Sequence, residues 1–425
     1  MSQNHTEQSS LKQQKPFHTA PWPVIDDEGK AAVLRVLESG KINYWTGEET
    51  RKFEEEFAVY CGVPYALAVS NGTLALELAL RACGIGAGDE VIVPSRTFIA
   101  TAGCVVAVGA TPIVCDIDPH TNDMSALTVA KVLTPRTKAI IAVHVGGYPA
   151  PMDEIIDLAQ QVGAYVLEDC AQAHGAAYHG HKVGSLGDVG CFSFCQDKIM
   201  PLGEGGMITF HDREKYERAW SYRDHGRSYE GMQKAAEQPG VSFKWLTDSF
   251  GSNARMGEME GALGRVLLRA LPQYHAQRTV HAYQLVNTMN ELAGIEPVIL
   301  DNNERAAGSA HAFYRLYARI DAAALKDEWS RDRILTELGA RGVPVQYGSC
   351  SLIAHEKAFQ RFASAQLNTW PEAQQVHEDS LAFLVHPTLT ECDMDNISAA
   401  LTEVMHRAVK PELLAPQDGV AETAE

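Results

Sequence analysis

Long apolar runs are absent from this 425-residue sequence, and none reaches the roughly 18 residues that a membrane-spanning helix needs. Positive charge is also scarce, because 36 Lys and Arg residues stand against 54 Asp and Glu residues, giving a formal net charge of −18. A surface this acidic repels nucleic acid and anionic membranes, so we expect neither as a partner. The segment Met1–Lys15 lacks the apolar stretch of a secretory signal, which favours a cytoplasmic location.

Metal-binding cysteine patterns are missing as well. The nine cysteines are odd in number, include no C-x-x-C pair, and mostly lie in apolar runs. We therefore expect buried free thiols in a reducing compartment. Cys191 and Cys195 are four residues apart, but the sequence around them is typical of a strand, so we expect no metal site there.

Apolar sequence is plentiful, at 45% of the chain, which is enough for a large buried core. Helical stretches such as Thr73–Cys83 and Asp153–Val162 alternate with short apolar runs. This alternation predicts an α/β fold with a mostly parallel, seven-stranded sheet flanked by helices. The candidate strands are Ala66–Val69, Val91–Pro94, Pro112–Asp116, Ala139–His144, Tyr165–Glu168, Gly190–Phe194 and Met207–Phe210.

The pattern changes after about Glu260 and predicts a smaller C-terminal α+β domain. Helices are expected over Gly261–Asn290, Arg331–Arg341 and Asn396–Val409, and the alternation in Phe313–Ile320 predicts a strand. We expect a large domain at 21–275, a small domain at 276–410, and loose tails at 1–20 and 411–425.

The first segment that suggests chemistry is Ser70-Asn71-Gly72-Thr73, which follows a predicted strand and opens a predicted helix. Amides at a helix N-terminus lack intrahelical partners and carry partial positive charge, so they suit a phosphate. Gly72 would let the phosphate approach the backbone, and Thr73 adds a hydroxyl. The alternative interpretation is an ordinary helix cap.

The second segment is Val166–Gly175, where an apolar strand ends in Glu168 and Asp169. Open α/β sheets bind ligands at the carboxyl ends of their strands. Asp169 there suits a pyridinium nitrogen, which it would keep protonated. The alternative is a solvated acid or a helix cap. We interpret His174 as a structural, hydrogen-bonding histidine rather than a catalyst.

The third segment contains Lys198, which follows an apolar strand and precedes the glycine-rich turn Gly203–Gly206. Most lysines are solvated surface groups. An apolar setting and neighbouring cations can lower the pKa of such an amine and make it nucleophilic. Ser193 lies five residues earlier and offers a hydroxyl to a phosphate. Phe98 follows another strand and suits either stacking on a planar cofactor or a place in the core.

Together these segments resemble the DegT/DnrJ/EryC1/StrS family of sugar aminotransferases, which depend on pyridoxal phosphate (PLP) and have the fold type I architecture. The resemblance runs from about Pro21 to Val409, and its specificity comes from the order and spacing of its motifs. They are Pro21-Trp22-Pro23, Leu37–Gly40, Thr46-Gly47, Phe53–Ala58, Asn71-Gly72-Thr73, Gly86–Val91, Glu168–Gln172, Ser193–Lys198, Gly203–Gly206, Gly251–Met256 and Leu389-Thr390-Glu391.

The resemblance implies a role for each candidate residue. Two residues are expected to be catalytic: Lys198, which would hold PLP as a Schiff base, and Asp169, which would partner the ring nitrogen. The remaining cofactor contacts it implies are Gln172 near the ring hydroxyl, Gly72, Thr73 and Ser193 at the phosphate, Phe98 stacked on the ring, and Asn253 reaching the phosphate of a neighbouring subunit.

The implied activity is transfer of an amino group from glutamate or glutamine to a keto sugar, linked to a nucleotide, by a homodimer with shared active sites. Two alternatives stay open: a PLP-dependent sugar dehydratase or lyase, and a non-catalytic regulatory relative. Relatives that act as dehydratases replace the lysine by histidine, whereas this chain keeps Lys198. The family's usual His-Tyr pair is replaced within Val345–Cys350, and Ser252 replaces an aromatic residue, so the substrate is less defined than the cofactor.

Overall fold

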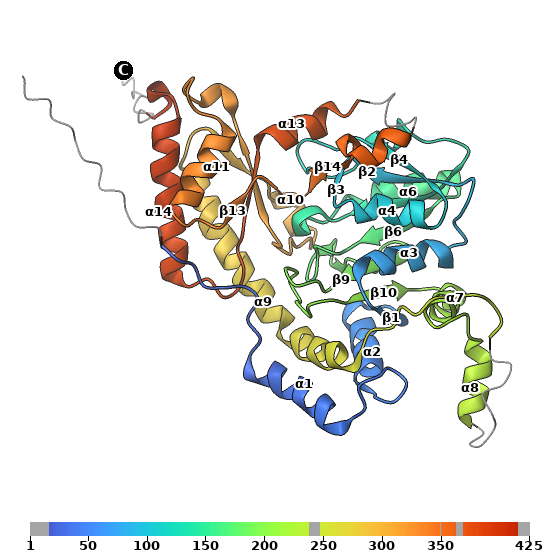
Figure 1. Cartoon of the computed structure of the whole chain (residues 1–425). Helices are drawn as coiled ribbons and strands as arrows, with labels where there is room; N and C mark the ends of the chain where they lie inside the picture. Colours follow the sequence, from blue (N-terminus) through green and yellow to red (C-terminus); the bar gives the residue numbers. More distant parts are fainter. Residues whose placement is uncertain (1–16, 238–246, 349, 363–368, 415–425) are drawn as a thin grey trace, which may run out of the picture.

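The computed structural model describes residues 17–237, 247–348, 350–362 and 369–414. The expected loose tails fall largely outside these residues. A large α/β unit and a smaller unit lie side by side, and the 33-residue helix α9 (Glu258–Asn290) runs from one to the other (Figure 1). The domain boundary expected near residue 275 falls inside this helix. Within the described residues, no helix is both long and apolar enough to cross a membrane.

The large unit is built on a seven-stranded sheet in the order β1-β10-β9-β6-β5-β2-β4. Only β10 runs antiparallel to its neighbours, so the prediction of a mostly parallel sheet is confirmed. All seven candidate strands are present, with ends within two residues of those expected. They are β1 (Tyr65–Val69), β2 (Glu90–Pro94), β4 (Thr111–Cys115), β5 (Thr137–Val143), β6 (Tyr165–Asp169), β9 (Val189–Ser193) and β10 (Gly206–Phe210).

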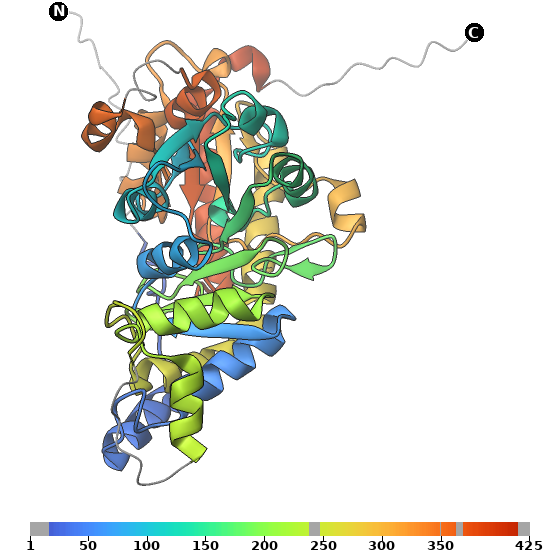
Figure 2. The same ribbon diagram turned by 90° about the vertical axis from the view of Figure 1, so that its right-hand side faces the viewer.

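Helices cover both faces of this sheet, as Figure 2 shows. In β2, Val91 and Val93 pack with α3 (Gly72–Ala82) and α4 (Ala100–Ala107), whereas Ile92 packs with α6 (Met152–Val162) on the other face. This alternation explains why the strands are apolar throughout. The other helices of the large unit are α1 (Asp27–Ser39), α2 (Glu49–Cys61), α5 (Ala126–Ala130), α7 (Arg213–Arg223) and α8 (Tyr229–Glu237).

The cysteines fit the expectation of buried thiols. All nine are free and seven are buried, whereas Cys195 is half-buried and Cys392 is exposed. Two short ribbons complete the large unit: β3 (Arg96–Thr97) pairs with β14 (Ser351–Leu352), and β7 (Ala177–Tyr178) pairs with β8 (His181–Lys182).

The small unit has a four-stranded antiparallel sheet in the order β11-β12-β15-β13, which confirms an α+β arrangement. Its strands are β11 (Ile295–Pro297), β12 (Leu316–Ile320), β13 (Val345–Gln346) and β15 (Ser380–Phe383). Its helices are α10 (Asn302–Ala306), α11 (Arg331–Ala340), α13 (Pro371–Asp379) and α14 (Glu391–Ala408).

The strand expected over Phe313–Ile320 begins three residues later, at Leu316. Phe313 has a positive φ of 50°, and the backbone before the strand bonds to the large unit instead. The Ala312 amide donates to Gly147 O at 2.8 Å, and the Arg315 amide donates to Gly146 O at 3.1 Å. This bonding holds the start of β12 against the carboxyl edge of the large sheet.

The chain also returns to the large unit after β13. Leu352 pairs with Arg96 through β14 and β3, and the Trp370 ring nitrogen donates to Val114 O at 3.2 Å. Leu352, Ile353 and Trp370 belong to the same apolar core as α3 and α4. The segment on which the substrate is expected to depend is therefore attached to the large sheet.

Candidate active site

Three of the predicted segments meet at the carboxyl edge of the large sheet. Strands β6 and β9 are parallel neighbours, so Asp169 and Ser193, their last residues, lie at the same edge. Gly72 opens α3 beside them: a Cβ added to Gly72 would lie 2.6 Å from the Ser193 Cβ. The structure thus brings together the residues expected to bind the phosphate and the ring nitrogen.

Asp169 is a buried carboxylate held by two hydrogen bonds. Its Oδ2 accepts from Thr101 Oγ1 at 2.8 Å, and its Oδ1 accepts from the Ala171 amide at 3.2 Å. Burial raises the pKa of this carboxyl, while these two hydrogen bonds and the charge of Lys198 oppose the rise. A positively charged N–H at the site would favour the ionised form, as a pyridinium partner requires.

Thr101 is a site residue that sequence reasoning missed. Thr101 lies in the first turn of α4, four residues after Thr97 of β3, and the two side-chain oxygens lie 2.8 Å apart. The spacing of two threonines four residues apart, on either side of Phe98, is the signal that could have indicated it.

The N-terminus of α3 has the features of a phosphate cradle. Asn71 caps the helix by accepting from the Leu74 amide at 2.9 Å, and the amides of Gly72 and Thr73 have no acceptor inside the helix. Ser193 is buried and Thr73 is exposed. A Cβ added to Gly206, which pairs with Ser193, would lie 2.5 Å from Asn71 O, so these backbones approach closely.

Lys198 lies in a partly enclosed position, with 16% of its side chain exposed. Its Nζ is 5.0 Å from the centre of the Tyr314 ring and 3.9 Å from Asp197 Oδ1. Its backbone carbonyl accepts from the Trp22 ring nitrogen at 3.3 Å. Tyr314 and Asp197 were not predicted, and Trp22 was noted only as part of a motif. The Lys198 side chain is thus partly enclosed, as expected, with a carboxylate and an aromatic ring beside its amine, and its role stays a prediction.

Gln172 connects this edge with the segment after β13. It is buried; its Oε1 accepts from the Gly146 amide at 2.7 Å, and its Nε2 donates to Cys350 Sγ at 3.3 Å. Cys350 is the last residue of the segment that departs from the family pattern, whereas Tyr347 earlier in it is 59% exposed. A substitution of Cys350 would therefore change a hydrogen bond of Gln172, the residue expected to contact the cofactor.

Phe98 and Asn253 are more exposed than the other predicted site residues of this edge except Thr73, and no side-chain hydrogen bond of theirs to those residues is observed in the described part of the chain. Phe98 is 60% exposed, and its carbonyl accepts from the Thr101 amide at 3.1 Å. Asn253 is exposed and lies opposite Asp224 in a short bridge, next to Ala254, whose carbonyl accepts from the Ser70 amide. The roles of Phe98 at the ring and of Asn253 in a neighbouring subunit stay predictions.

The interpretation of His174 needs one correction. The residue is buried between Phe192 and Phe194, with ring centroids 5.4 and 5.3 Å away, as a structural residue should be. However, neither ring nitrogen has a hydrogen-bond partner among the described residues, so the predicted hydrogen bonding is wrong. Burial in aromatic surroundings lowers the pKa of His174 to about 3 and keeps the ring neutral.

One buried group of potential metal ligands exists in the described residues, formed by His144, Glu168 and Cys170. Its carboxylate is already occupied: Glu168 accepts from three backbone amides between Gly184 and Gly187 at 2.7–2.8 Å and lies 3.1 Å from His144 Nε2. Burial raises the pKa of the Cys170 thiol, whereas a metal ligand must be a thiolate. The group is best explained as a structural network behind Asp169.

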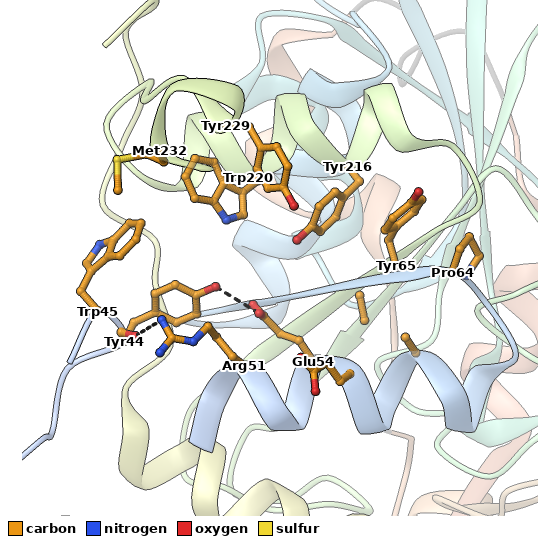
Figure 3. A pocket seen from close by; sticks show the side chains of 13 residues that line it. Tyr44, Trp45, Arg51, Glu54, Pro64, Tyr65, Tyr216, Trp220, Tyr229 and Met232 are labelled. Atoms are coloured by element: carbon orange, nitrogen blue, oxygen red, sulfur yellow. Dashed lines mark hydrogen bonds between the residues drawn. The ribbon is translucent and has the colours of Figure 1, made fainter. Parts of the chain in front are cut away.

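A pocket of about 450 Å³ lies at the N-terminal end of β1, whereas the predicted phosphate cradle follows the C-terminal end of this strand (Figure 3). None of the predicted site residues lines it. In its wall, the Glu54 carboxylate accepts from Tyr44 and from the buried Arg223, which is followed by Asp224, the bridge partner of Asn253. This network fixes the segment that carries Asn253. The lining residues labelled in Figure 3 are Tyr44, Trp45, Arg51, Glu54, Pro64, Tyr65, Tyr216, Trp220, Tyr229 and Met232.

A mostly parallel seven-stranded sheet and a smaller α+β unit, with a buried aspartate at the sheet edge and a partly enclosed lysine, match the architecture of fold type I aminotransferases. The model of the DegT/DnrJ/EryC1/StrS aminotransferase family matches residues 23–402, and the chain belongs to this family.

Relatives with known names show the same relationship. GDP-perosamine synthase of Caulobacter vibrioides is 34% identical over 385 residues, which cover 90% of this chain and 97% of that protein. L-glutamine:2-deoxy-scyllo-inosose aminotransferase of Streptomyces fradiae is 34% identical, over 79% of this chain and 80% of that protein. The crystal structure of an aminotransferase from Psychrobacter cryohalolentis is 45% identical and superposes with a TM-score of 0.88, covering 92% of this chain and 99% of that one.

Proposed function

We propose that this aminotransferase uses pyridoxal phosphate to move an amino group from glutamate or glutamine to a keto sugar carried on a nucleotide, in the biosynthesis of amino sugars for surface glycans. The observation that supports it most is the placement of a buried carboxylate, Asp169, at the same carboxyl edge of the sheet as Ser193, five residues before Lys198. The cradle formed by Gly72, Ser193 and the α3 N-terminus lies at the same edge.

The chemistry of the residues present fits the cofactor. Gly72, Thr73 and Ser193 would bind its phosphate, Asp169 its ring nitrogen, and Gln172 its ring hydroxyl. Phe98 would stack on the ring, and Asn253 of a second copy of the chain would complete the phosphate site in a homodimer. When bound, pyridoxal phosphate withdraws electrons from the substrate carbon next to the transferred nitrogen.

The chain's own residues would divide the remaining work. Lys198 Nζ takes a proton from the donor α-carbon as a base and returns it as an acid. Asp169 stays ionised and holds a proton on the ring nitrogen. The keto acid leaves before the sugar binds, so one set of residues serves both half-reactions in turn. Charge at Asp169 and alignment of Lys198 are needed in the transition state, so their loss lowers kcat.

A cyclitol ketone is the second candidate for the acceptor. The relative named for 2-deoxy-scyllo-inosose is as similar to this chain as the relative named for GDP-perosamine, at 34% identity. The departures within Val345–Cys350 fall in the segment expected to contact the acceptor. Both acceptors share polyhydroxylated ketone chemistry, and only the nucleotide separates them.

The test is amine transfer from ¹⁵N-labelled L-glutamate to a panel of nucleotide-linked keto sugars and cyclitol ketones, with mass spectrometry of the products. We expect the label in an amino sugar that still carries its nucleotide. A dehydrated product without label would support the lyase alternative instead. Failure of the purified protein to turn yellow with added pyridoxal phosphate would support a non-catalytic relative.

A further inference from the structure

Two buried arginines near Lys198 have hydrogen-bonding capacity that the chain does not use. Arg278 of α9 is 1% exposed and Arg315, just before β12, is 6% exposed. One terminal nitrogen of Arg278 donates to Phe313 O at 3.2 Å, and one of Arg315 donates to Tyr314 O at 3.0 Å. Among the described residues, Nε and Nη2 of Arg278 and Nε of Arg315 have no partner.

The charges of this pair are not balanced. Asp197 is the carboxylate nearest to Arg315, 3.7 Å from its Nη2, and it also accepts from the Tyr314 hydroxyl. Arg278 has no carboxylate within 4.0 Å in the described parts of the chain and lies over the Trp22 ring, 5.1 Å from its centre. A buried positive charge without a counter-ion is costly.

The pKa of Arg278 agrees with this imbalance of charge. Burial, and next the positive charge of Arg315, lower the pKa of Arg278 to about 9, so the group stays protonated at neutral pH. Arg278 therefore keeps its positive charge near that of Arg315, and among the described residues Asp197 is the one carboxylate within 4.0 Å of either side chain. The pair of arginines therefore lacks a negative counter-charge. We expect that charge beside Arg315, which is more exposed than Arg278.

The upper limit on the distance from Arg315 to Lys198 is long enough for an amino acid to contact both. The Arg315 guanidinium carbon and Lys198 Nζ are 4.1 and 5.0 Å from the centre of the same Tyr314 ring, so they lie within about 9 Å of each other. An amino acid places its α-carboxylate about 2.5 Å, and a glutamate side-chain carboxylate about 5 Å, from its nitrogen. When a carboxylate pairs with two nitrogens of a guanidinium, the carboxylate carbon and the guanidinium carbon are about 4 Å apart, which adds to these lengths.

We propose that Arg315, with Arg278 behind it, binds a carboxylate of the amino donor. The proposal rests on the proposed function and adds the residue that recognises the donor. The backbone of Arg315 is anchored to Gly146, whose amide bonds Gln172, so the small unit presents the guanidinium to the same edge as the cofactor contacts. The forked geometry of Arg315 suits a planar carboxylate, which the keto-sugar ring of the acceptor lacks.

The first experiment mixes the holoenzyme rapidly with L-glutamate and follows the cofactor absorbance. Arg315→Gln should raise the glutamate concentration for half-maximal rate roughly ten- to hundred-fold, the range for loss of a hydrogen-bonded charge. Arg315→Lys keeps the charge without the fork and should give a smaller rise, and it serves if the glutamine variant does not fold. The matched control is Arg319→Gln, four residues further along, where the arginine pairs with Asp379; it should change the value less than two-fold.

The second experiment measures binding of glutarate, a dicarboxylate that has no amino group, by calorimetry. Arg315→Gln should weaken it by a similar factor. If glutamate and glutamine are affected equally, Arg315 binds the α-carboxylate; if glutamate alone is affected, it binds the side-chain carboxylate. Folded Arg315 variants with unchanged glutamate dependence and unchanged glutarate binding overturn the proposal. A wild-type enzyme that reacts with neither glutamate nor glutamine contradicts the proposed function, and glutarate then still decides whether Arg315 binds carboxylates.

Discussion

At the residue scale, the hydrogen bond from Thr101 to Asp169 sets how easily that carboxylate ionises. Thr101→Val would leave one oxygen of a buried carboxylate unpaired, at a cost of about 1–3 kcal/mol. Because the bond lowers the pKa of Asp169, its loss raises that pKa, and the acid limb of the kcat profile should move to higher pH. Thr101→Ser, which keeps the hydroxyl, should restore the wild-type limb. An unchanged profile in the valine variant would argue against an ionised Asp169 in the reaction.

His174 offers a stability prediction at the same scale. Its pKa is about 3 in the folded protein and about 6.5 in the unfolded chain, so the unfolded chain binds the extra proton as the pH falls below 6.5. At pH 5 this costs the fold about 2 kcal/mol. His174→Leu should therefore lose less stability than wild type between pH 7.5 and pH 5 in denaturant titrations. The exposed His120→Leu is the control, and equal losses in all three proteins would refute the account.

At the scale of elements, the close packing of α3 against β9 forms the expected phosphate cradle. Gly72→Ala would place a methyl group 2.6 Å from the Ser193 Cβ, so the helix start must move away from the strand. Overpacking of this kind costs about 1–3 kcal/mol, and we expect at least ten-fold weaker binding of pyridoxal phosphate in equilibrium dialysis. Gly86→Ala is the control, since its nearest neighbour would be 3.8 Å away. Equal affinities would place the phosphate elsewhere.

The elements themselves were largely predictable from sequence. Both faces of the large sheet are covered, so each strand appears as a continuous apolar run, and Asp169 ends one of them. The contacts of Lys198 with Tyr314 and of Gln172 with Cys350 were not predictable, since the latter pair is 178 residues apart. The late start of β12 at Leu316 follows from bonds to Gly146 and Gly147 in the other unit, which no local pattern contains.

At the scale of the whole molecule, the proposed homodimer with shared sites predicts complementation. Lys198→Ala and Asn253→Ala should each be nearly inactive as pure proteins, if Asn253 serves the neighbouring subunit. A mixed dimer pairs the intact Lys198 of one chain with the intact Asn253 of the other, so one of its two sites is complete. Mixing after mild dissociation should therefore restore up to about a quarter of wild-type activity. No recovery, with mixed dimers detected by native mass spectrometry, would mean that each site is built from one chain.

The central claim concerns Lys198, and one measurement tests it most directly. The protein is loaded with pyridoxal phosphate, reduced with borohydride to make the lysine–cofactor bond permanent, digested, and mapped by mass spectrometry. The account predicts the pyridoxyl group on the peptide that contains Lys198, and its absence from folded Lys198→Ala protein. A pyridoxyl group on another lysine, or on none, would contradict the account.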